Sequence, residues 1–336
     1  MNGTATAAQS PPAVTAYKEW GYVSGRLSVL ETQLLPRSFF EGMLRSRNFS
    51  DARSALAKTA YRTVFVADEQ VRDYSEALDS AEETLQKDIL DVSPPHVLAS
   101  FFEMPRRYLV FRSLFLRAAA RGASVSDLEA TFESLAANLS ELAALEYHIA
   151  ALRSREAPQS ADAVARSLYL DSAVCALQLA LADSAPEEKV RRLLHDIAVL
   201  KSWSAVLRSR WNGTPAEVIR RWFMFKEAYG EMVRVTAALA ESNPAGGLAG
   251  CLSDGALRVL RALEADTIRR NVDAAAGETI RDQALDLRMV TYGPERVLSY
   301  FAAIAVEQEN LRLVLSSIVN GVEPRIVLER LRREYA

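Results

Sequence analysis

The side chains best suited to catalysis or metal binding in this sequence are three histidines and two cysteines. His96, His148 and His195 are far apart, and none follows a glutamate by three residues or belongs to an H-E-x-x-H motif. Those spacings bring metal ligands together on a helix. Cys175 and Cys251 are also widely separated, and neither has a second cysteine at metal or redox-motif spacing. We therefore expect no metal site and two reduced thiols, as in a reducing compartment.

Other arrangements of reactive residues are equally sparse. His195 and Asp196 have the residue types of an acid–base pair, but adjacent positions on a helix do not face each other. The chain has no Gly-Lys pair for a P-loop, no G-x-G-x-x-G motif and no two adjacent aspartates. An aspartate-rich cluster would be needed to hold magnesium and diphosphate in an all-α terpenoid-type enzyme. We therefore predict no catalytic residue, no cofactor and no metal.

Composition and charge narrow the possible partners. The 336 residues are 49% hydrophobic and 25% charged, which is typical of a globular protein, and the formal net charge is −3. Nucleic-acid binding needs clustered excess cations, so nucleic acid is not an expected partner.

A membrane-spanning segment is not expected either. No stretch reaches the roughly 18 uncharged apolar residues that a spanning helix needs. The best candidates, 101–116 and 297–319, both contain charged residues. Residues 1–15 lack the basic and apolar regions of a signal peptide, so we predict a flexible tail there. Any work at a membrane would then require a protein partner.

The elements that must position these residues all have helical periodicity. The first helix has an apolar seam with spacings of four and three, formed by Ala16, Trp20, Val23, Leu27, Leu30 and Leu34. Pro36 should end or redirect it. We predict a second helix from an N-cap near Ser50, and a third over residues 69–90 that Ser93-Pro94-Pro95 ends. Further breaks are expected at Pro158, Ala185-Pro186, Asn212–Pro215, Asn243–Gly247 and Tyr292-Gly293-Pro294. No alternating strand pattern of useful length occurs, so the predicted fold class is all-α.

A helix, a glycine turn and another helix recur three times, around Gly122, Gly213 and Gly321. Each glycine has Leu116, Leu207 or Leu315 six residues before it and Leu128, Ile219 or Val327 six residues after it. Arg121, Asn212 or Asn320 precedes the glycine, as in a helix that ends on a left-handed residue. The pattern predicts three related helical subdomains, although three unrelated helix ends would also produce it. We place the domains at 16–130, 131–225 and 226–336, after the tail at 1–15.

Two groups of side chains allow more than one interpretation. The aromatic residues Trp203, Trp211, Trp222 and Phe223 have helical spacing, which favours a core over a stacking surface. The last helix has a basic face that is either solvated or part of an interface, formed by Arg325, Arg330, Arg332 and Arg333.

Both ends of the chain carry the residues of a known family. The C-terminal segment reads Gly293-Pro294-Glu295, Tyr300, Glu307 to Arg312 (EQENLR), Asn320-Gly321 and Glu329 to Tyr335 (ERLRREY). The N-terminal segment reads AYKEWGYVSGRLSVLETQLLPRSFFEGML from Ala16, followed by Leu56, Thr59, Ala60 and Tyr61. With the weaker match at Tyr169 and Asn212-Gly213, the chain resembles the C subunit of bacterial and archaeal V/A-type ATPases, whose eukaryotic counterpart is the d subunit of the V-ATPase.

The resemblance implies three similar helical bundles around a pseudo-threefold axis, forming a funnel or socket. It implies a non-catalytic rotor component between the D and F subunits of the central stalk and the membrane proteolipid ring. Such a component is present in one copy in a hetero-oligomeric complex, lies on the cytoplasmic side of the membrane and is peripheral to it. It transmits torque for ATP-driven ion transport or for ATP synthesis.

One segment departs from the family. Where members often have an Asp and an Asn-Leu-Lys pattern in the first Gly-turn helix, this chain has Met104-Pro105-Arg106-Arg107-Tyr108. Two alternatives to the rotor component remain. An all-α enzyme would have a carboxylate-lined pocket that no motif reveals, and an unrelated helical scaffold would share the composition but lack the C-terminal signature.

Overall fold

In the computed structural model, the described residues are 12–46, 48–62, 65, 74–103, 163–222, 248–263 and 272–332. Within these ranges there are twelve helical elements and no strand, so the all-α prediction is confirmed for them. The chain divides into two compact units. Unit 1 comprises residues 1–94 and 284–336, and unit 2 comprises residues 95–283.

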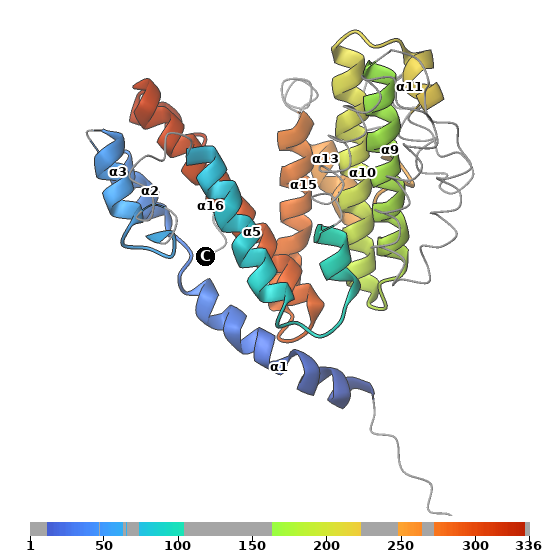
Figure 1. The fold of residues 1–336 in the computed structure, drawn as a ribbon, viewed down its shortest axis with the longest axis horizontal. Helices are drawn as coiled ribbons and strands as arrows, with labels where there is room; N and C mark the ends of the chain where they lie inside the picture. Colours follow the sequence, from blue (N-terminus) through green and yellow to red (C-terminus); the bar gives the residue numbers. More distant parts are fainter. Residues whose placement is uncertain are drawn as a thin grey trace, which may run out of the picture. The chain divides into compact units, whose positions relative to one another are not determined.

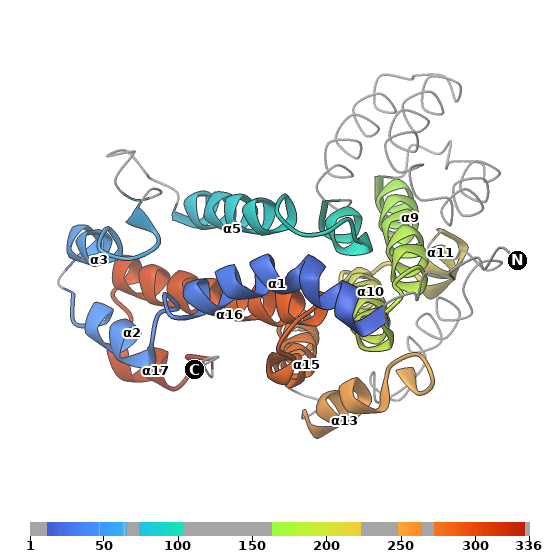
Figure 2. The same cartoon turned by 90° about the horizontal axis from the view of Figure 1, so that it is seen from below.

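Unit 1 is organised around its longest helix, α16 (Pro294–Asn320). The other helices that contact α16 come from both ends of the chain, and Figures 1 and 2 show α5 and α1 running beside it. These helices are α1 (Pro12–Glu31), α2 (Arg37–Met43), α3 (Phe49–Leu56), α5 (Tyr74–Leu90), the 3-10 helix η4 (Leu287–Met289) and α17 (Pro324–Leu328). The N-terminal and C-terminal segments thus form one core.

The seam of the first helix is confirmed in part, because the Ala16 side chain lies outside what is described and the helix ends at Glu31, before Leu34. Trp20, Val23 and Leu27 are buried, whereas Leu30 and Leu34 are partly exposed. Arg296 of α16 joins the two helices, because it pairs with Glu31 of α1 at 2.8 Å and donates to the Ser28 hydroxyl at 2.9 Å. Helix α1 begins at Pro12, so 12–15 are helical, while 1–11 lie outside the described residues.

The helix start near residue 50 differs in detail from the prediction, and a short helix that was not predicted precedes it. Pro36 is followed by the short helix α2, and the N-cap of α3 is Asn48 rather than Ser50. The Asn48 side chain accepts a bond from the Asp51 backbone N–H at 2.9 Å. Asn and Ser are about equally good N-caps, so residue type alone could not choose between them.

The apolar core of unit 1 gathers large side chains from five of its helices. Burying such a side chain contributes roughly 1.5–3 kcal/mol, so this cluster holds the two ends of the chain together. Its most deeply buried large side chains are Phe40, Met43, Leu56, Phe65, Leu78, Leu311, Val314, Leu315 and Val327.

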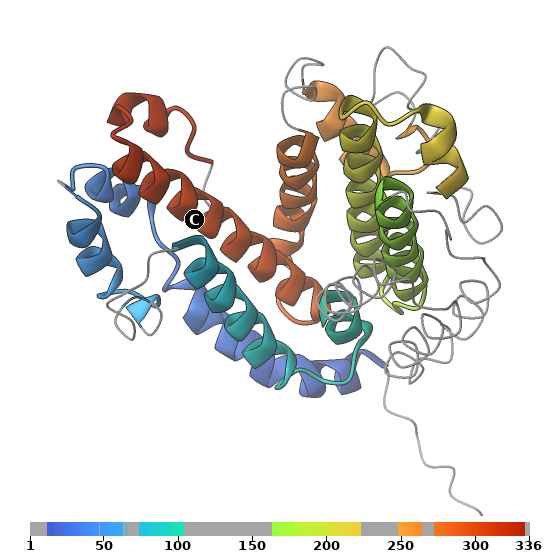
Figure 3. The same ribbon diagram turned by 45° about the horizontal axis from the view of Figure 1, so that its top comes forward.

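Unit 2 has at its centre α9 (Ala163–Asp183) and α10 (Glu188–Trp211), which lie side by side in Figures 1 and 3. They meet at the predicted Ala185-Pro186 break. Helix α11 (Ala216–Trp222) packs on both, and α13 (Asp254–Ala262) follows Ser253. Helix α15 (Val272–Asp286) begins in this unit, where Asp273 pairs with Arg208 of α10 at 2.9 Å.

Two of the three predicted glycine turns lie in the described residues, and both have the expected geometry. Gly213 has φ 89° and Gly321 has φ 64°, the left-handed region that favours glycine. In each turn the backbone N–H of the residue after the glycine donates to a carbonyl of the last helical turn. Thr214 donates to Ser209 at 3.0 Å, and Val322 donates to Ser317 at 2.9 Å. The flanking apolar residues Leu207, Ile219, Leu315 and Val327 are all buried. The third turn, at Gly122, lies outside the described residues, as do both boundaries between the predicted bundles, so the three-bundle division stays a prediction.

Candidate functional site

The most unusual polar group in unit 1 is the carboxylate of Glu307, near the middle of α16. It occupies an inward-facing position, because Ile304 three residues before it and Leu311 four residues after it are both buried. Glu307 itself is only 7% exposed. Glutamate is rarely buried to this extent without a partner.

Two neutral donors bond to this carboxylate. The backbone N–H of Leu35, in the connection between α1 and α2, donates to Oε2. The hydroxyl of Tyr61 donates to Oε1 at 2.8 Å. Glu307 thereby links α16 to two segments of the N-terminal part of the chain.

Burial sets the protonation behaviour of this pair. Loss of solvation raises the pKa of Glu307 to about 7, although the bonds from Leu35 and Tyr61 partly offset that rise by favouring the carboxylate. The Tyr61 pKa is also raised, first by burial and then by the nearby carboxylate. Tyr61 is therefore a neutral donor, and Glu307 changes charge near neutral pH.

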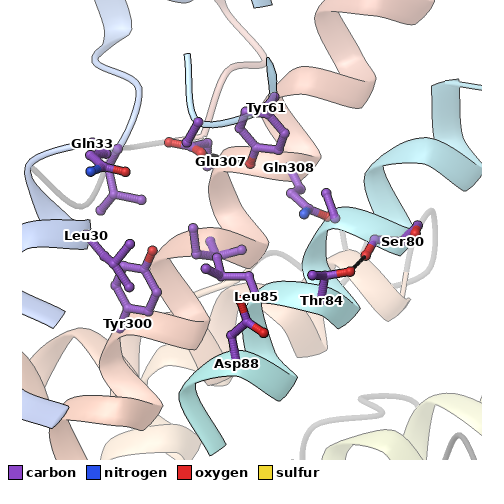
Figure 4. Close-up of a pocket in the computed structure, with 14 residues that line it drawn as sticks. Leu30, Gln33, Tyr61, Ser80, Thr84, Leu85, Asp88, Tyr300, Glu307 and Gln308 are labelled. Carbon is purple, nitrogen blue, oxygen red and sulfur yellow. Dashed lines mark hydrogen bonds between the residues drawn. The ribbon is translucent and has the colours of Figure 1, made fainter. Parts of the chain in front are cut away.

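The pair lines a cavity of about 250 Å³ within unit 1, which we call the Glu307 cavity. Figure 4 shows Glu307 and Tyr61 close to each other and to Gln308, with Tyr300, Leu30 and Leu85 on other parts of the wall. Exposed residues such as Gln33, Thr84 and Asp88 also line it, so the cavity reaches solvent. Asp88 lies within 3.8 Å of Arg26, which balances its charge.

The remaining polar residues of the 307–312 motif have structural partners. The Asn310 side-chain amide bonds both the backbone N–H of Arg332, at 2.8 Å, and its carbonyl, at 3.2 Å. Arg312 pairs with Asp79 of α5, and Glu309 pairs with Arg332 at 2.8 Å. The motif therefore holds α5 and the C-terminal segment against α16.

A second buried carboxylate lies in unit 2. Asp196 on α10 accepts bonds from the Ser253 backbone N–H at 2.9 Å and from the Ser253 hydroxyl at 2.5 Å. Ser253 is also the N-cap of α13. Burial raises the pKa of Asp196, and the two bonds from Ser253 oppose that rise. Its observed contacts give Asp196 of the His195–Asp196 pair a structural role, in fixing the start of α13.

The other candidate residues divide between core and surface. Both cysteines are free and buried, and burial raises the pKa of Cys175 to about 12, which leaves its thiol protonated. The core prediction is confirmed for Trp203, which is fully buried, and wrong for Trp211, which is 44% exposed at the end of α10. The Trp222 side chain and Phe223 lie outside what is described.

The basic C-terminal face is split. Arg325 and Arg330 are exposed, whereas Arg332 takes part in the contacts with Glu309 and Asn310. Arg333 lies outside the described residues.

The described part of the chain contains no group of three or more His, Cys, Asp or Glu side chains placed to hold a metal ion. His96 instead contacts Glu187, with 2.9 Å between Nε2 and Oε2. No helix described here has the length and apolar character needed to cross a bilayer.

Comparison with known proteins adds no family assignment: no protein-family model matches this sequence, and no curated protein is significantly similar to it.

Proposed function

We propose that this protein is a non-catalytic rotor component of a V/A-type ATPase, which couples the central stalk to the membrane proteolipid ring. The observation that carries the proposal is the meeting of the two segments that resemble the C subunit of these ATPases. Leu35 and Tyr61 from the N-terminal segment donate to Glu307 of the C-terminal segment. Residues far apart in the sequence thus share one packed unit, which two chance matches would not require.

The contacts of the 307–312 motif are suited to transmitting force. Glu307, Asn310 and Arg312 connect α16 to three other parts of unit 1. A spacer that carries torque must keep its helices in register under load, and close packing with fixed polar contacts gives that stiffness. These residues support the proposal as structural elements of the rotor.

The paired glycine turns support an internally repeated chain. The same arrangement of a helix, a left-handed glycine and a second helix occurs in both units, as α10 and α11 in unit 2 and as α16 and α17 in unit 1. Buried apolar residues occupy matching positions in the two copies. A third copy at Gly122 would complete three similar bundles around a pseudo-threefold axis. The funnel arrangement belongs to the proposal.

The enzyme alternative requires several carboxylates that converge on a pocket. Among the described residues that line the Glu307 cavity, the carboxylates are Glu307 and Asp88. Glu307 is held by Leu35 and Tyr61, and Asp88 lies beside Arg26. This arrangement favours the rotor component over hydrolytic or metal-assisted chemistry.

Isolation of the complex tests the proposed partners. The tagged protein would be affinity-purified from gently solubilised native membranes, and its companions identified by mass spectrometry. We expect the D and F subunits of the central stalk and the proteolipid, and a tagged unrelated cytoplasmic protein should recover none of them. Recovery of this chain without stalk or proteolipid components would contradict the proposal.

Gene deletion tests the coupling role. In membranes from the deletion strain we expect the catalytic head to retain ATP hydrolysis while ATP-driven proton or sodium pumping is lost. A plasmid copy of the gene should restore pumping. Normal pumping without the gene would rule out the proposed role.

A further inference from the structure

Among the described residues, none places an opposite charge beside Glu307. Its partners in the described part of the chain are the neutral donors Leu35 N–H and Tyr61 Oη, and it forms no ion pair there. None of the fourteen described residues that line the Glu307 cavity is Lys, Arg or His. An ionised carboxylate that is largely buried is costly unless a proton or a cation neutralises it.

The carboxylate has the capacity to bind a further donor. Each carboxylate oxygen has two acceptor positions, and the described residues use one on Oε1 and one on Oε2. The side chain also borders the cavity, as Figure 4 shows. A donor that enters the cavity can therefore approach Glu307 without displacing Leu35 or Tyr61.

The lining favours an organic cation over other ligands. Anions are excluded by the sign of the charge. A divalent metal ion needs several oxygen ligands, whereas Glu307 is the single buried carboxylate among the described residues of the lining. Leu30, Leu85 and Ile304 supply apolar wall for an alkyl chain. Tyr61 and Tyr300 supply aromatic rings, which attract ammonium groups.

We propose that the Glu307 cavity binds a primary ammonium group on a short alkyl chain, with Glu307 as the counter-charge. The ammonium can belong to a free alkylamine or to a lysine side chain of another protein, since the two share this chemistry. The inference does not rest on the proposed rotor function, because it uses only contacts within unit 1.

Calorimetric titration of the full chain at pH 8 tests the proposal, with n-butylammonium as the probe and n-butanol as its uncharged analogue. We expect one butylammonium per chain and much weaker binding of butanol. Glu307→Gln keeps the size of the side chain but removes its charge, and should weaken butylammonium binding at least about tenfold. Undetectable butylammonium binding, equal binding of butanol, or unchanged binding in Glu307→Gln would each overturn the proposal.

Two further variants separate loss of the site from loss of the fold. Glu309→Gln makes the same change two residues along α16, outside the cavity lining, and should bind butylammonium as the wild type does. Leu85→Phe keeps Glu307 and fills part of the cavity, so it should also weaken binding. If Glu307→Gln does not fold, unchanged binding in Leu85→Phe overturns the proposal by itself. Far-ultraviolet circular dichroism establishes which variants fold.

A competition experiment distinguishes the two sources of the ammonium. Nα-acetyl-lysine methylamide presents the same group with a peptide backbone attached. If it displaces butylammonium with higher affinity, the cavity is assigned to a lysine side chain of a partner. If butylammonium binds more tightly, the cavity is assigned to a free amine. Both results require Glu307 and support the proposal.

Discussion

The stability of unit 1 depends on the charge of one residue, Glu307. Burial raises its pKa from the ordinary value of 4.5 to about 7 in the folded protein. Between these two values the folded state holds the proton more tightly than the unfolded state does. Protonation of Glu307 therefore stabilises the fold, and this contribution is lost as the pH rises through 7.

We expect the titration of Glu307 to reduce the free energy of unfolding by about 2–3 kcal/mol as the pH rises from 5 to 8. Glu307→Gln has no such titration, so its stability should depend less on pH by that amount. Urea unfolding of both proteins at the two pH values measures the difference. Asp196 has a raised pKa in both proteins, so its effect cancels in the comparison. Equal pH dependence would contradict the assignment.

The candidate site could be predicted from the sequence only in part. Residues 307–312 stood out as a motif, but the burial of Glu307 did not. The sequence contains a signal for this burial, because Glu307 falls in an apolar seam with spacings of four, three, four and three. The seam is formed by Tyr300, Ile304, Glu307, Leu311 and Val314. Its bonds to Leu35 and Tyr61 could not be predicted, because they join residues more than 240 positions apart.

At the scale of elements, the glycine turns show what local sequence determines. The left-handed conformations of Gly213 and Gly321 followed from the positions of the glycines at predicted helix ends. The start of α3 could not be predicted in the same way, since Asn48 and Ser50 are both suitable caps. Local chemistry thus identifies helices and their ends, whereas the choice between neighbouring caps depends on packing.

Alanine at two exposed glycines should have opposite effects. Gly321 has a left-handed backbone, so Gly321→Ala should cost about 1–2 kcal/mol even though no atom lies near the added Cβ. Gly25 lies within α1 with similar free space, so Gly25→Ala should stabilise by roughly 0.5–1 kcal/mol. Thermal unfolding of the two variants measures both effects. A stabilising Gly321→Ala would contradict the role of the turn.

At the scale of the whole molecule, each compact unit has its own fluorescent reporter. Trp20 is the single tryptophan of unit 1, and the fully buried Trp203 belongs to unit 2. Variants that keep only Trp20 or only Trp203 should therefore follow the two units separately during urea unfolding.

We expect Asn310→Ala to destabilise unit 1 alone. The substitution removes two bonds to the Arg332 backbone from a buried position, at a cost of about 1–3 kcal/mol. The midpoint reported by Trp20 should fall, and that reported by Trp203 should stay unchanged. Asn320→Ala is the control, because the Asn320 side chain is exposed and, among the described residues, bonds only to Ser316. Equal shifts of both midpoints would show that the chain unfolds as one cooperative unit.

The division of unit 1 between the two ends of the chain also determines when it can form on the ribosome. Helix α16 begins at Pro294, 204 residues after α5 ends at Leu90 (294 − 90). At roughly 5–20 residues per second, the N-terminal helices wait about 10–40 s for the helix against which they pack. During that interval α1 and α5 lack the helix they contact, and Leu78 lacks the α16 members of its apolar cluster. Nascent chains of this protein should therefore bind chaperones through their first 90 residues until the C-terminal segment emerges.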